Sequence, residues 1–165
     1  MENNKRNFKK FNKRKREKPE FEQKLLDLAR VTRVVKGGRR FSFRATMVIG
    51  DKKGRVGVGV GKGTDVSNAI AKAVNNAKKN MITITTENGT ILYDVKIKFG
   101  SARIMLKPAR KGRGIVAGGA VRAVVDLAGV KDIVSKSLGT SNKLNVARAT
   151  VEALKEIEAG ANNDK

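Results

Sequence analysis

The sequence of 165 residues contains no cysteine and no histidine. These absences exclude a disulfide, a thiolate nucleophile and a zinc site built from cysteine and histidine ligands. We therefore expect neither a metal nor a cofactor. Only 4% of the residues are aromatic and none is tryptophan, so a sheet that stacks bases on aromatic rings is not expected either.

Long apolar segments are also missing. No apolar run approaches the roughly 20 residues that a membrane-spanning helix needs. The first residues lack the apolar core of a signal peptide. On these grounds we expect a soluble, cytoplasmic protein.

Acidic residues are scarce relative to basic ones. The chain has 37 Lys and Arg against 15 Asp and Glu, which gives a formal net charge of +22. Such an excess repels itself unless a polyanion neutralises it. Nucleic acid is the favoured polyanion, and an anionic membrane surface is the second choice.

The first 20 residues are predicted to be a disordered basic arm. Met1 to Lys18 hold nine Lys or Arg, and Phe8 and Phe11 are their only large apolar side chains. A segment of this composition cannot bury a core. We expect it to lie along phosphates rather than to serve only as a solubilising tail.

The next segment predicts a sheet. The apolar spacing in 21–29 suggests a short helix, and 31–35 begin a first strand. Apolar side chains then alternate over 41–49, as in a half-buried strand. In 56–61 valines alternate with glycines. A strand face made only of glycine is expected where a helix or another backbone approaches closely.

A helix is predicted from Thr64-Asp65, which can cap it, to about residue 80. Amides of 61–63 and Lys62 precede its start, where a helix favours a phosphate. Neither nucleotide-binding pattern fits, however. Lys62 and Thr64 break G-x-G-x-x-G, and the Walker A pattern finds Val56 and Gly63 at positions that need glycine and Ser or Thr. No nucleotide cofactor is assigned.

The second half alternates strands and helices, which indicates an α+β or α/β subdomain. Asn88-Gly89 between alternating apolar runs predicts a β-hairpin. Gly129 is expected to end a helix that Gly118 opens. The full set of expected elements is a hairpin of 82–85 with 91–98, a strand at 102–106, an irregular loop at 107–114, a helix at 118–129, a strand at 133–138, a helix from 145 and a frayed tail at 161–165.

Several motifs, consistently spaced between about Phe21 and Glu158, resemble those of the family of ribosomal protein five of the bacterial small subunit. They are Val35-Lys36-Gly37-Gly38-Arg39, Phe41-Ser42-Phe43, Gly50-Asp51, Gly54-Arg55-Val56-Gly57, Gly61-Lys62, Gly114-Ile115-Val116-Ala117-Gly118-Gly119, Ala128-Gly129-Val130 and Asn145-Val146-Ala147-Arg148-Ala149-Thr150.

The resemblance implies an α+β fold of two domains. The first, at 21–84, would be a β-sheet with a packed helix, related to double-stranded-RNA-binding domains. The second, at 85–160, would have a β-α-β-α core with a left-handed crossover. The resemblance also implies a non-enzymatic constituent of the small subunit that binds 16S rRNA, braces head against body and influences translational accuracy. Ribosomal proteins four and eight would be its neighbours, with the mRNA entry region nearby.

The expected rRNA contacts are cations together with two glycines that let the backbone approach RNA. They are Arg33, Lys36, Gly37, Gly38, Arg39, Arg40, Lys52, Lys53, Arg55, Lys62, Lys107, Arg110, Lys111 and Arg113. Contacts with a protein partner are implied for Gly112, Gly114 and Arg122. The family commonly has an acidic residue and a threonine where this chain has Lys111 and Arg113. The loop that would contact protein four therefore carries two added cations.

Two other classes of function share some of these features. A free RNA chaperone or nucleoid protein would have the same charge but would be found outside ribosomes. A small-molecule kinase could share the fold of the second domain. The failed phosphate-loop patterns and the lack of histidine and cysteine argue against an enzyme.

Overall fold

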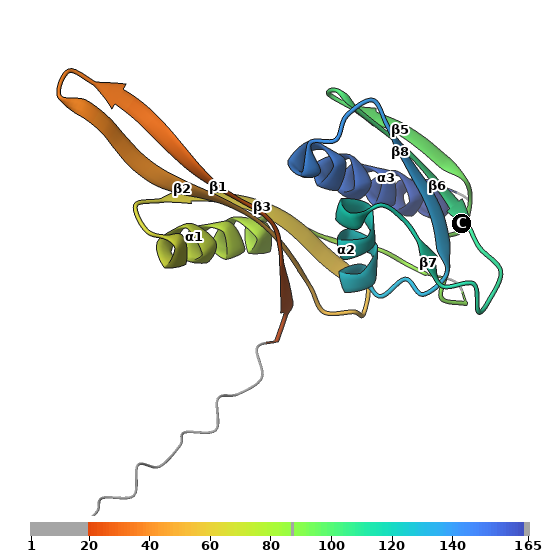
Figure 1. Ribbon diagram of the computed structural model, residues 1–165. Coiled ribbons are helices and arrows are strands. Elements are labelled where there is room, and N and C mark those ends of the chain that lie inside the picture. The colour runs from red at the N-terminus through yellow and green to blue at the C-terminus, as the bar shows by residue number, and fades with distance from the viewer. Residues whose placement is uncertain (1–19, 87, 164–165) are drawn as a thin grey trace, which may run out of the picture.

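The computed structural model describes residues 20–86 and 88–163, so the predicted arm lies outside the described residues except for Glu20. Residues 161–163 continue the last helix instead of forming a frayed tail, and 164–165 are outside the described residues. Figure 1 shows two sheets with helices between and beside them. In chain order the elements are β1 (Glu22–Val35), β2 (Gly38–Gly50), β3 (Arg55–Gly63), α1 (Val66–Lys79), β4 (Met81–Thr83), β5 (Val95–Phe99), β6 (Ala102–Pro108), β7 (Ile115–Val116), α2 (Gly119–Ala128), β8 (Ile133–Leu138) and α3 (Lys143–Asn163).

The first sheet is antiparallel with the order β1-β2-β3-β4. Its glycine face packs against α1, as the alternation in 56–61 predicts. A Cβ atom placed on Gly59 would lie 2.2 Å from the carbonyl oxygen of Ala73, and one on Gly61 would lie 2.3 Å from that of Ala69. Because Ala69, Ala73 and Ala77 are the buried side of α1, small residues on both elements let helix and sheet meet backbone to backbone.

The short helix predicted at 21–29 is wrong, because residues 22–29 belong to β1. They pair with β2 from Glu22 opposite Gly50 onward. The register shifts between Leu25 and Asp27, so one extra residue, Leu26, interrupts the alternation. A β-bulge of this kind moves the following side chains to the other face. The apolar spacing then no longer has a period of two, and it imitates a helix.

The second sheet has the order β5-β6-β8-β7. β7 and β8 are parallel and are joined by α2, and α3 packs against β5 and β6. This is the expected β-α-β-α core, although the handedness of its crossover stays a prediction. The helix prediction at 118–129 is confirmed, because α2 ends at Gly129, which has the left-handed φ of 89°.

The hairpin predicted around Asn88-Gly89 is also wrong. β4 pairs with β3 in the first sheet, whereas β5 pairs with β6 in the second. Asn88 and Gly89 do adopt the positive φ values of 50° and 81° that suit a tight turn. The carbonyl of Gly89, however, accepts the N–H groups of Lys131 and Asp132. The turn therefore docks on the second half instead of closing a hairpin.

The two halves share one hydrophobic core, in which α2 and α3 lie between the sheets (Figure 1). Val48 and Val56 of the first sheet belong to the same buried cluster as Leu106 of the second sheet and Leu154 of α3. The division into two domains at residue 84 stays a prediction. What the packing fixes is the position of the first sheet relative to the second half.

The turn between β2 and β3 also connects the two halves through backbone hydrogen bonds. The N–H groups of Lys52 and Gly54 donate to the carbonyls of Leu127 and Ala128, at 3.0 and 2.9 Å. These carbonyls are at the C-terminal end of α2, where the last carbonyl oxygens of a helix have no N–H donor within the helix. The turn therefore caps α2 and anchors the first sheet to it.

Asp51 holds this turn in shape. Its carboxylate accepts the N–H groups of Lys53 and Arg55 at 2.8 and 3.0 Å and the Arg55 Nε at 2.7 Å. Burial alone would raise the pKa of the Asp51 carboxyl, but the hydrogen bonds from Arg55 and from the two backbone N–H groups outweigh burial. The pKa is lowered below its ordinary value of 3.8.

We expect Asp51→Ala to lower the free energy of unfolding by about 1–3 kcal/mol at pH 7, because charge-assisted bonds in the turn are lost. A depressed carboxyl pKa contributes stability that is present above pH 3.8 and is lost as the pH falls through the lower, folded-state pKa. The difference in urea unfolding between the variant and the parent protein should therefore shrink below about pH 4.

Asp94→Ala is the matched control, since Asp94 pairs with Lys107 at 3.1 Å and both side chains are about half exposed. This change should cost less than about 1 kcal/mol. Equal losses in the two variants, or an Asp51→Ala deficit that does not depend on pH, would contradict the assignment.

Candidate nucleic-acid interface

The most prominent feature for binding is the far end of the β1–β2 hairpin. The last pair between β2 and β3 is Phe43 with Gly63, whereas β1 and β2 stay paired as far as Val35 and Gly38. Residues 31–42 therefore extend beyond the sheet as a two-stranded ribbon, which Figure 1 shows projecting away from the rest of the molecule. We call these residues the distal ribbon. Val34 is 75% exposed there, so the ribbon is not built to bury a core.

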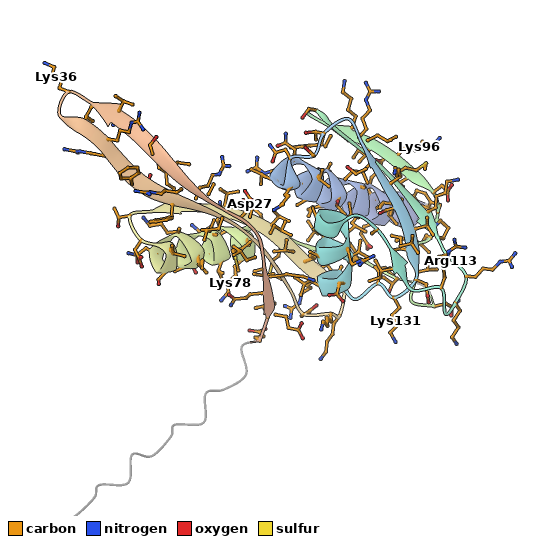
Figure 2. All side chains as sticks on the ribbon, in the orientation of Figure 1. Asp27, Lys36, Lys78, Lys96, Arg113 and Lys131 are labelled. Atoms are coloured by element: carbon orange, nitrogen blue, oxygen red, sulfur yellow. The ribbon has the colours of Figure 1, made fainter. Side chains whose placement is uncertain are left out.

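Lys36 and Gly37 form the turn at the tip of the distal ribbon, where Figure 2 labels Lys36. Gly38 follows with φ of 141°, a value that side chains with a Cβ rarely adopt. A Cβ on Gly37 or Gly38 would meet no atom of the described protein within 4 Å. Packing therefore does not require either glycine, and the backbone at the tip is open to a ligand.

One face of the ribbon and of the adjoining sheet gathers four cations. Arg33 lies directly opposite Arg40, and four positions further along β2, on the same face, Arg44 lies opposite Lys62 of β3. Like charges placed opposite each other destabilise a sheet by about 0.2–1 kcal/mol per pair. None of the four is in an ion pair with a carboxylate among the described residues. We call this set the ribbon arginine face.

The opposite face of the ribbon carries Arg39 and Arg30. The Arg30 guanidinium lies 3.6 Å from the ring centroid of Phe41, which is 47% exposed. This stacking holds the Arg30 side chain along the strand. Arg30 and Arg44 were not among the expected contacts, although the acid-free stretch between Leu28 and Gly50 contains both. The alternation of β2 and its pairing with β3 are what place Arg44 beside the others.

A second group of expected contacts lies at the opposite end of β2, in the turn that caps α2. The Lys52 Nζ is 2.7 Å from Glu22, and Arg55 pairs with Asp51 at 2.7 Å and with Glu20 at 3.6 Å. The hydrogen bond to Glu22 raises the pKa of Lys52, and the one to Asp51 raises the pKa of Arg55. Both cations are already paired, in contrast to those of the ribbon arginine face, and Lys53 is the exposed cation between them.

The phosphate site expected at the start of α1 is not formed as predicted. The Asp65 carboxylate accepts the Ser67 N–H at 3.2 Å, so the chain's own negative charge occupies the helix N-terminus. A Cβ on Gly63 would be 2.7 Å from the Ala69 nitrogen, which makes this glycine a packing residue. Lys62 instead points to the same face as Arg44 and belongs to the ribbon arginine face.

The loop between β6 and β7 holds the expected contacts of the second half. Gly112 and Gly114 have φ of 86° and 75°, and the Gly114 N–H donates to Asp132 at 2.7 Å, which fixes the end of the loop. Arg110, Lys111 and Arg113 are exposed on it, while Lys107 pairs with Asp94. Figure 2 shows Arg113 at the opposite end of the molecule from Lys36. The expected cations therefore form several separate surfaces.

Arg122, an expected protein contact, lies in the first turns of α2. It lines an open hollow of about 650 Å³ together with Lys52, Asp126 and Lys131. The structure thus places Arg122 near the capping turn. It lines the same hollow as Lys52, which is one of the expected RNA contacts. Sequence spacing gave no sign of this neighbourhood.

Two further observations concern other kinds of site. Within residues 20–86 and 88–163, no helix combines the length and the apolar character that a membrane span requires. In the same ranges no group of three acidic side chains comes together as it would to hold a metal ion.

Comparisons with known proteins agree with the motif pattern. The family model described as "Ribosomal protein S5, N-terminal domain" matches residues 21–85, and "Ribosomal protein S5, C-terminal domain" matches residues 97–162. The chain is 53% identical over 135 residues to the protein named "Small ribosomal subunit protein uS5" in Campylobacter jejuni strains 81-176 and RM1221. The match covers 82% of this chain and 92% of each relative.

Proposed function

Because the chain belongs to the ribosomal protein S5 family, we propose that it is a cytoplasmic structural constituent of the small ribosomal subunit that binds 16S rRNA. It braces the head of the subunit against the body and influences translational accuracy. The observation that carries the proposal is the ribbon arginine face, whose four cations, two on the ribbon and two on the adjoining sheet, have no carboxylate partner in the part of the chain that the structure describes. The positive charge of such a surface is neutralised only when the surface binds a polyanion.

In the proposed mode of binding, the protein holds RNA by its phosphates and catalyses no reaction. The distal ribbon meets phosphates with Arg33, Lys36, Arg39 and Arg40, and the open tip at Gly37 and Gly38 lets the backbone come close to RNA. Phosphate contacts position RNA without reading its sequence. The shape of the RNA and its 2′-hydroxyls supply the remaining recognition. No catalytic step is assigned to any residue.

The paired cations take part in a second way. Lys52 and Lys107 exchange their exposed carboxylate partners for phosphates, and Arg55 exchanges its exposed partner Glu20 while it keeps its bond to Asp51. The cost is small because exposed ion pairs are worth about 0–1 kcal/mol. Lys53, Lys62, Arg110, Lys111 and Arg113 complete the proposed rRNA contacts. Gly112, Gly114 and Arg122 contact a neighbouring protein, and small-subunit proteins four and eight are the proposed neighbours, with the mRNA entry region nearby.

The proposal is tested by the salt dependence of binding to small-subunit rRNA and by sedimentation. If about ten phosphates are neutralised, the affinity should fall by roughly 10³–10⁵ between 50 and 200 mM salt. The protein should also travel with the small subunit in a gradient at moderate salt. A salt slope near zero, or a protein that binds RNA but sediments apart from the particle, would support a free RNA chaperone instead.

A further inference from the structure

The outer side of the second sheet carries a basic surface that belongs neither to the distal ribbon nor to the loop at 107–114, apart from Lys107. In β5, β6 and β8 one set of side chains, including Val95, Ile104 and Ile133, is buried toward α2 and α3. The alternate positions point the other way. Those that are charged are all basic and all exposed, and we call them the outer basic face: Lys96, Lys98, Arg103, Lys107 and Lys136.

The strand register brings these cations together. Lys98 lies directly opposite Arg103, and Lys96 and Lys136 lie on either side of Met105 in the next row. Among the described residues, Lys107 forms an ion pair with Asp94, and the other four cations form none. Figure 2 shows Lys96 on the side of this sheet that faces away from the helices. The arrangement opposes like charges, as in the ribbon arginine face, and within the described ranges Asp94 is the one carboxylate that pairs with it.

We propose that the outer basic face binds the sugar-phosphate backbone of RNA. This inference rests on the proposed function and adds a separate contact surface to it. Residues two apart on a strand, such as Lys96 and Lys98, are about 6.7 Å apart along the strand, so neighbouring lysines can contact successive phosphates of one RNA strand. The strand positions on this face include no aromatic side chain, so the face offers no ring on which a base could stack. The contact is therefore to the backbone and independent of sequence.

The test compares three forms of the full chain for binding to a transcript of small-subunit rRNA. The first is the parent protein. The second is Lys96→Gln/Lys98→Gln/Lys136→Gln. The third, a matched control, is Lys72→Gln/Lys79→Gln/Lys155→Gln, which removes three exposed lysines from other surfaces. The outer-face variant should flatten the log–log salt slope by about two to three and weaken binding on the order of 100-fold near 0.15 M salt.

Hydroxyl-radical footprinting gives a second readout. The outer-face variant should lose protection of a run of backbone positions while the positions protected by the distal ribbon stay unchanged. Circular dichroism and urea unfolding should match the parent protein, because all three lysines are exposed. The control triple variant should keep the footprint.

The outcomes separate the two proposals. If the parent protein does not bind the transcript, the proposed function fails. If the parent protein binds and the outer-face variant binds with the same slope and footprint, the inference about this face is wrong and the proposed function stands. Loss of a neighbouring protein from the assembled subunit with an unchanged RNA footprint would assign the face to an acidic protein and would also overturn the inference.

Discussion

Gly59→Ala should lower the free energy of unfolding by about 3–5 kcal/mol, the upper range for a single substitution. A single methyl group has this effect because of what it would meet. The added Cβ would lie 2.2 Å from the carbonyl oxygen of Ala73 and 2.3 Å from the nitrogen of Ala77. Both are backbone atoms of α1, which cannot turn aside as a flexible side chain does. The helix must move away from the sheet, and the contacts along its buried side are lost.

Gly119→Ala is the control for this change. A Cβ on Gly119 would meet no atom within 4 Å, and the residue is at the start of α2. Alanine there should leave stability unchanged or raise it by about 0.4–1 kcal/mol, since the unfolded chain loses freedom. Urea unfolding followed by circular dichroism measures both variants. If Gly59→Ala proved as stable as Gly119→Ala, the close approach of β3 and α1 would be refuted.

Arg33→Glu/Arg40→Glu should weaken binding to small-subunit rRNA on the order of 1,000-fold near 0.15 M salt. Each reversal should remove one proposed phosphate contact and add a repulsion, and the log–log salt slope should flatten by at least about two. Both residues lie on the distal ribbon away from the shared core, so the far-ultraviolet spectrum should not change. Filter binding over a range of salt concentrations measures the effect, and Lys72→Glu/Lys155→Glu on α1 and α3 is the control.

The single change Arg40→Glu separates binding from folding. It turns an opposed pair of cations into a cross-strand ion pair with Arg33, which should stabilise the free protein by about 0.2–1 kcal/mol. The same change should weaken RNA binding. A variant that is less stable and also binds less well would show that the arginine pair serves the fold, and the ribbon arginine face would lose its proposed role.

The parts of the fold that the sequence predicts well are those where one side-chain pattern has one explanation. The alternation over 41–49 predicts β2. The glycines between Val56, Val58 and Val60 predict a close neighbour, which is α1. Asp65 is identified as a helix cap from its position before an apolar stripe, and its bond to Ser67 confirms this. In each case the local pattern and the tertiary packing agree.

The predictions that failed depend on contacts that are distant in the chain. The bulge at Leu26 is visible only in the register with β2, so the spacing in 21–29 taken alone predicts a helix. Asn88-Gly89 has the conformation of a turn, but β4 and β5 pair with partners in different sheets. Local preference sets the turn, whereas the packing of the second half decides which strands it joins.

The candidate site shows the same limit. The sequence identifies the cations of the distal ribbon because they follow one another without an acid between them. It does not reveal that Arg44 and Lys62 extend the same face, since eighteen positions separate them and only the pairing of β2 with β3 aligns them. Lys96, Lys98 and Lys136 form one surface for a similar reason, because β8 follows β6 in the sheet but not in the chain.

The anchoring of the β2–β3 turn on α2 has a mechanical consequence. β2 runs without a break from the tip at Gly38 to Gly50, and the next residues are bonded to the last carbonyls of α2. The ribbon is thus attached at one end to the interior of the protein, and β2 connects its tip to α2 as one uninterrupted strand. A force applied at Lys36 would therefore be carried along one continuous strand to the C-terminal end of α2, and we expect the ribbon and this helix to move together.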